Sequence, residues 1–193
     1  MKNILALTLA ASACLLTGAS GAHGTLGAKV PEAEVEKRLC ENAPCQRNLR
    51  VSLKKKDGSV YENTFPVFPA AIQSFGITVV AGQTLHVEAD LVEGKLANMR
   101  VVETVLHPEK TLTATFTQHE DGGMLLALSN PFDQTIRFRM GIMPLDAEQL
   151  YATSSCPIGA HQSSYEMWPY PIFQVILGDG QVIGKDDSLA CVE

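Results

Sequence analysis

The sequence predicts an all-β protein, an antiparallel β-sandwich with a short helix near its N-terminus. About nine short stretches alternate apolar and polar residues and follow one another roughly every 8–12 residues, a spacing typical of sandwiches. Asp-Gly and other glycine-containing turn signals separate several of these stretches, and little of the chain has helical spacing. A small β-barrel is the alternative architecture that the same pattern allows.

Residues 1–22 have the order of a secretory signal peptide, with one positive charge, a short apolar run and a small-residue tail. Cleavage after Ala22 fits that tail best, and cleavage after Gly21 fits nearly as well. The run is shorter than the roughly 20 apolar residues that cross a membrane, so the protein is not expected to be transmembrane. We therefore expect a bacterial protein that is periplasmic or secreted.

A second interpretation of the leader makes the quartet ASAC a lipobox, so that Cys14 carries a lipid anchor. Leu15 and Leu16 continue the apolar run beyond that cysteine, which favours the signal peptidase site instead.

Residues 23–46 form an N-terminal segment, and residues 47–193 are expected to make a single β-sandwich domain, long enough to bury one core. Within the first segment PEAEVEKRLC (31–40) predicts a brief helix, because Val35 and Leu39 lie four apart on one face. The domain begins with NLRVSLKK and SVYENTF, which flank Asp57-Gly58 and predict a hairpin. FPVFPAAIQS then interrupts the pattern with two prolines.

The middle strands are predicted from strict alternation. In TLHVEADLV (84–92) Leu85, Val87, Ala89 and Leu91 would face the core, with His86, Glu88 and Asp90 in solvent. FGITVV (75–80) and KLANMRVVETV (95–105) are its expected neighbours along the chain.

The later strands follow the same logic. TLTATFTQ (111–118) and TIRFRMGIM (135–143) alternate, whereas MLLALSN (124–130) is apolar on both faces and predicts a central strand. DAEQLYA (146–152) suggests one helical turn, and 154–171 suggests a long loop. IFQVILG, QVIG and SLACV complete the chain.

Four cysteines follow the leader: Cys40, Cys45, Cys156 and Cys191. An even number in an exported chain predicts two disulfides, and three pairings are open. The local pairs Cys40–Cys45 and Cys156–Cys191 are preferred, since a C-x4-C spacing is poor for zinc. The order Cys156…Trp168…Cys191 resembles the core of immunoglobulin domains and implies an immunoglobulin-like sandwich. The two cysteines are closer than in that family, so we transfer none of its core residues.

The charge balance excludes one class of partner. The chain has 15 Lys and Arg against 21 Asp and Glu, a net charge of −6, and loss of Lys2 with the leader makes it −7. Such an acidic chain is not expected to bind nucleic acid. Its basic cluster, Arg47, Arg50 and Lys54–Lys56, is expected around a solvated hairpin.

Copper is the main alternative function. If cleavage follows Ala22, the mature chain begins His23-Gly24, which resembles the start of periplasmic copper-resistance proteins and of lytic polysaccharide monooxygenases. Both families have β-sandwich folds, and the resemblance implies copper held by His23 as the metal ligand. A second histidine would come from His86, His107, His119 or His161. The methionines at 99, 124, 140, 143 and 167 are too scattered for a copper(I) motif and are expected to fill the core.

No catalytic motif stands in the sequence, so no catalytic residue and no other cofactor are expected. Cys156 and His161 suggest a thiol nucleophile with its base, but Cys156 is expected in a disulfide. Glu88 and Asp90, about 7 Å apart along one strand face, have the spacing of a glycosidase pair only superficially.

The strongest candidate surface is QSSYEMWPYPIF, where Tyr165, Trp168 and Tyr170 gather within six residues. Stiff aromatic loops at the end of a sandwich often bind partners. Alternatively, Trp168 closes the open end of the sandwich beneath the disulfide. The sequence thus predicts a non-catalytic exported β-sandwich that binds a protein or an envelope component, with Tyr165, Trp168 and Tyr170 as partner-binding residues.

Overall fold

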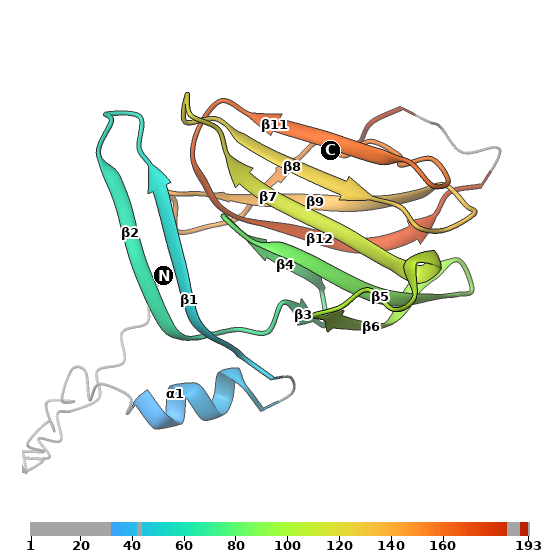
Figure 1. Ribbon diagram of the computed structural model, residues 1–193, viewed down its shortest axis with the longest axis horizontal. Helices are drawn as coiled ribbons and strands as arrows, with labels where there is room; N and C mark the ends of the chain where they lie inside the picture. The colour runs from blue at the N-terminus through green and yellow to red at the C-terminus, as the bar shows by residue number, and fades with distance from the viewer. Residues whose placement is uncertain (1–31, 42–43, 185–189, 193) are drawn as a thin grey trace, which may run out of the picture. The chain divides into compact units, whose positions relative to one another are not determined.

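The computed structural model describes residues 32–41, 44–184 and 190–192, and these residues form an all-β sandwich with one short helix, as predicted (Figure 1). The predicted signal peptide, Cys14 and His23 lie outside the described residues. Helix α1 spans Glu32–Leu39. The strands are β1 (Gln46–Lys54), β2 (Val60–Phe68), β3 (Ile72–Gln73), β4 (Gly76–Val80), β5 (Thr84–Val92), β6 (Lys95–Val102), β7 (Thr111–Gln118), β8 (Met124–Ser129), β9 (Ile136–Pro144), β10 (Tyr151–Thr153), β11 (Ser163–Trp168) and β12 (Ile172–Val182). None of the helices among these residues is long and apolar enough to cross a membrane.

The sandwich has two antiparallel layers. One has the strand order β6-β5-β7-β8-β11 and the other β3-β4-β12-β9-β10. The far end of β12 leaves its own layer and pairs with β6 at Gln181↔Lys95, which joins the two layers along one edge. A shared core of alternate side chains fills the space between the layers. These two layers do not establish an immunoglobulin-like strand arrangement, which stays a prediction.

The expected alternation is confirmed in the central strands. On β7, Leu112, Ala114 and Phe116 are buried, and on β9 the four inward positions from Ile136 to Ile142 are buried. Strand β8 lies between β7 and β11, as its apolar character on both faces predicted. The core therefore follows from period-two placement of large apolar side chains.

The first hairpin forms a sheet of its own in the described chain, without backbone pairing to either layer. Strands β1 and β2 pair only with each other among the described strands, around a turn at Asp57-Gly58. Val51 and Leu53 are nonetheless fully buried in the common core, and Phe65 contacts Phe173 at the start of β12. The hairpin therefore packs across the end of the sandwich where β12 begins, visible at the left of Figure 1.

Three local predictions were wrong. Residues 146–152 form no helical turn: Tyr151–Thr153 is instead the short strand β10, because pairing with β9 outweighs helix propensity. The expected loop 154–171 contains strand β11, which pairs with β8 over its whole length. Glu88 is buried rather than wet, because the long side chain of Arg100 covers it in an ion pair with an Nε–Oε2 distance of 3.0 Å.

Candidate binding sites

The edge of the sandwich between β10 and β11 is closed by residues 153–158, which we call the pinned segment. Its Ile158 exchanges two backbone hydrogen bonds with Ile136 at the start of β9. The buried amide of Asn130 donates to the carbonyl oxygens of Ile158 and Gly159 at 2.9 Å each. A disulfide joins Cys156 to Cys191, and Ser155 pairs with Val192, so the C-terminal residues are fastened to the same segment.

Trp168 seals the inner side of this edge. Its side chain is 8% exposed, and its ring stands edge-on to Phe116 with centroids 6.2 Å apart. The indole Nε1–H donates to Thr153 Oγ1 at 3.1 Å, which satisfies the only polar atom of the side chain. Trp168 therefore has the position that the closing hypothesis gave it.

Glu166 is the second side chain of β11 that points to the pinned segment. Partial burial raises the pKa of its carboxyl, and a hydrogen bond from the backbone N–H of Cys156 opposes that rise without cancelling it. The same strand turns Tyr165 and Met167 to solvent, and Tyr165 is 67% exposed. The structure therefore does not bring Tyr165, Trp168 and Tyr170 together on one surface.

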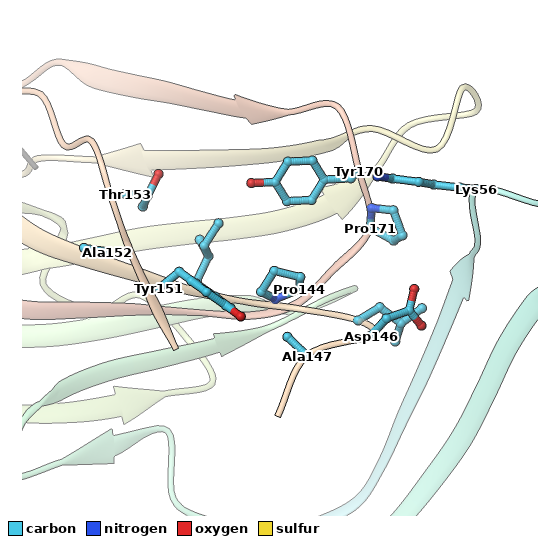
Figure 2. Close-up of a pocket in the computed structure, with 11 residues that line it drawn as sticks. Lys56, Pro144, Asp146, Ala147, Tyr151, Ala152, Thr153, Tyr170 and Pro171 are labelled. Carbon is cyan, nitrogen blue, oxygen red and sulfur yellow. The ribbon is translucent and has the colours of Figure 1, made fainter. Parts of the chain in front are cut away.

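Tyr170 lines a separate cavity of about 490 Å³, which we call the tyrosine pocket. The pocket is built from three segments that are distant in sequence: the tip of the β1–β2 hairpin, residues 142–153, and the β11–β12 connection. Its lining residues are Lys56, Ile142, Pro144, Leu145, Asp146, Ala147, Tyr151, Ala152, Thr153, Tyr170 and Pro171. Figure 2 shows Pro144 near Tyr151 and Tyr170 in the wall of the pocket, with Lys56 extended toward Tyr170.

The chemistry of the tyrosine pocket is that of a binding site. The Lys56 ammonium lies 5.4 Å from the centre of the Tyr170 ring, a cation–π contact. Gln149 Nε2 donates to the Tyr151 hydroxyl at 3.0 Å, which helps to orient a side chain that is largely open to solvent. Apolar walls with a few polar groups at the rim are typical of ligand pockets. Sequence analysis identified Tyr170 but missed Tyr151 and Lys56, because only the fold brings the three segments together.

A larger cavity of about 880 Å³ opens at the opposite edge of the sandwich, between β3 and β6. We call it the β3/β6 cleft. Its apolar lining is Leu39, Pro44, Pro69, Ala70, Ala71, Ile72, Leu85, Met99 and Val101, and its polar lining is Arg38, Gln46, Gln73, Ser74 and Arg100. The disulfide Cys40–Cys45 lies next to Pro44 in sequence, so this edge also has a disulfide beside it.

The remaining titratable candidates are dispersed. His161 Nε2 lies 2.6 Å from Asp133 Oδ1 on an exposed turn, His107 is near Glu109, and His86 Nδ1 contacts Thr113 Oγ1 at 3.0 Å. Within 32–41, 44–184 and 190–192, no three His, Cys, Asp or Glu side chains come together in a group that could hold a metal ion. Cys156 is in a disulfide, so it presents no thiol to His161.

The methionines follow the core-filling expectation in part. Met124 and Met140 are buried in the core and Met99 packs against it, whereas Met167 is exposed.

No protein-family model, curated protein or solved structure matches this chain. The function must therefore be inferred from the residues of the sites themselves.

Proposed function

We propose that this is an exported, non-catalytic protein that binds a partner protein in the periplasm or outside the cell through the tyrosine pocket. The observation that carries the proposal is the convergence of Tyr151, Tyr170 and Lys56 from three distant segments on one apolar concavity. Tyrosine side chains bury large contact areas at low cost in side-chain entropy, and they are enriched where binding energy concentrates.

The lining favours a segment of protein as the ligand. Pro144 and Pro171 give the pocket rigid apolar walls, and the two tyrosine rings supply flat faces on which a proline or aliphatic side chain can pack. Tyr151 belongs to β10, the terminal strand of its layer in the described chain. Backbone groups at such an edge can pair with an extended partner beside the pocket.

Two disulfides support the export on which this proposal depends. Cys40–Cys45 and Cys156–Cys191 have S–S distances of 2.05 and 1.94 Å, and such bonds persist mainly in oxidising compartments.

Site-specific photo-crosslinking tests the proposal directly. A benzoylphenylalanine in place of Tyr151 would be irradiated in the cells that produce the protein, and the adducts would be identified by mass spectrometry. We expect one defined protein adduct from position 151. The matched control is the same replacement at Tyr165, a tyrosine that is also exposed but lies on β11 away from the pocket.

The identified partner would then be titrated against purified variants. Lys56→Ala changes an exposed rim residue and should weaken binding by about tenfold if the ammonium contacts the partner. Identical adducts from positions 151 and 165, or affinity unchanged in both Lys56→Ala and Tyr151→Ala, would refute a binding role for this pocket.

A further inference from the structure

The β3/β6 cleft exposes apolar side chains on the inner face of a layer. Val101 lies opposite Val87 in the β5–β6 ladder, so both side chains point to the same, inner face of the layer. Val87 is 1% exposed, whereas Val101 is 46% exposed and lines the cleft with Met99. An inward-facing valine open to solvent indicates that no element among the described residues covers this part of the core.

In the part of the chain that the structure describes, no long strand supplies such cover at this edge. Strand β12 pairs with β6 only at Gln181↔Lys95, near the start of β6. In the described chain, residues 97–102 therefore pair with β5 on one side and with no strand on the other. Across the cleft, β3 has only the two residues Ile72 and Gln73. The edge thus presents unpaired backbone groups beside an apolar floor.

The charges at the rim restrict the occupant. Among the described residues that line the cleft, the charged ones are Arg38 and Arg100, so the charged part of the lining is entirely basic. The ion pairs with Glu34 and Glu88 leave further guanidinium N–H groups on both arginines. A carboxylate brought by a ligand would find these remaining donors here, because Glu34 and Glu88 do not themselves line the cleft.

We propose that the β3/β6 cleft binds an extended segment of a partner protein as an added β-strand. The segment pairs its backbone with the outer edge of residues 97–102 and places alternate apolar side chains over Val101, Met99 and Leu85. An acidic side chain of the same segment meets Arg38 or Arg100. This site is separate from the tyrosine pocket, with which it shares no lining residue.

A phage-displayed library of linear peptides, selected on the purified chain without its predicted leader, tests the proposal. We expect the enriched peptides to alternate apolar residues with others and to carry at least one Asp or Glu. Amide hydrogen exchange should slow at residues 97–102 when a selected peptide is added. Peptides without this alternation, or exchange in that segment that is already slow in the free chain, would overturn the proposal, the latter by showing that this chain or a second copy covers the edge.

Substitutions of two exposed valines distinguish binding at the cleft from a general effect on the surface. Val101→Asp should weaken peptide binding by about tenfold or more, because it places a carboxylate on the apolar floor. Val92→Asp is the control: Val92 is 47% exposed on β5 but does not line the cleft, and its effect should stay within about twofold. Equal loss in both variants would refute the site.

Two further variants keep the test decisive. Val101→Thr keeps the side-chain shape and should weaken binding in the same direction even if Val101→Asp unfolds the protein. Tyr151→Ala should leave peptide binding within about twofold, so a failure of the tyrosine pocket proposal is distinguishable from a failure here.

Discussion

The two edges of the sandwich differ in how the gap between the layers is covered. At the β10/β11 edge the gap between the layers is filled by the pinned segment, by Trp168 and by a disulfide that fastens the C-terminal residues. At the β3/β6 edge the layers separate into a cleft where Val101 stays half exposed. Each edge has a disulfide beside it, but only the first disulfide holds a segment across the gap.

The difference teaches that covalent fastening and core closure are separate properties. Cys156–Cys191 bridges residues 35 apart in sequence and ties two segments together, whereas Cys40–Cys45 links residues only 5 apart. The first restricts the unfolded chain far more than the second. Stability should therefore concentrate at the pinned edge, and free surface for binding at the open one.

The largest expected effect is at Trp168. Trp168→Ala should lower the free energy of unfolding by about 3–5 kcal/mol, because it leaves a cavity beside Phe116 and removes the bond to Thr153. Urea denaturation followed by circular dichroism measures the loss. The neighbouring Met167→Ala, at an exposed position, should stay within about 0.5 kcal/mol. A small loss in Trp168→Ala would contradict the closed edge.

The two disulfides give the next comparison. Replacing Cys156 and Cys191 together with serine should cost about 4 kcal/mol, and the same change at Cys40 and Cys45 about 2 kcal/mol, from the loop lengths they close. Thermal unfolding of both double variants ranks them. Equal losses would show that loop length does not govern their contribution.

Substitutions of two valines compare the free energy of unfolding that the core and the open edge contribute. Val87→Ala should cost about 2 kcal/mol, since it removes two buried carbon atoms and leaves a cavity. Val101→Ala, opposite it on the same face, should cost less than about 1 kcal/mol, because that side chain is already half in water. Similar costs would mean that Val101 is covered in solution.

Glu166 gives a pH-dependent test of the pinned edge. Its folded-state pKa is raised above 4.5, so the protonated carboxyl favours folding and that contribution is lost as the pH rises through the folded pKa. Glu166→Gln should therefore be more stable than the parent at neutral pH, and the advantage should shrink as the pH falls toward 4.5. Urea titrations at a series of pH values measure the difference.

Asp57 provides a control of opposite sign for that titration. Hydrogen bonds from Ser59 lower the pKa of its carboxyl below 3.8, so its contribution is present above that value and lost as the pH falls through the lowered pKa. If Glu166→Gln behaves as expected, a stability difference for Asp57→Asn with the same pH direction would contradict the assignment for Asp57.

Much of the fold could be predicted because the inward residues of β5, β7 and β9 repeat with period two. Strand β11 was missed because its inner face carries Ser164 and Glu166 in place of apolar side chains, and Glu166 accepts a hydrogen bond from Cys156 of the pinned segment. Without an apolar alternation the stretch resembles a loop between prolines. Glu88 was misplaced because strand period alone does not show that a neighbouring arginine will cover a carboxylate.

The sites were less accessible to sequence analysis than the fold. The tyrosine pocket needs Lys56, Tyr151 and Tyr170 from segments that only the tertiary structure unites. The β3/β6 cleft arises from strand pairing that ends early, and a sequence carries no direct signal for a missing partner. The adjacent valines at 101 and 102, apolar on both faces of a strand, are the one local sign of an apolar surface at this edge.

Strand β12 has a consequence for the order in which the molecule assembles. It is the last strand of the described residues, yet it pairs with β4, β9 and β6 and lies in the middle of its layer. Strands β3 and β4 therefore cannot join their layer until a segment about a hundred residues further along the chain is present. Contacts of such long sequence separation form slowly. The layer that contains β3, β4, β9 and β10 therefore lacks its central strand until Ile172–Val182 has been made.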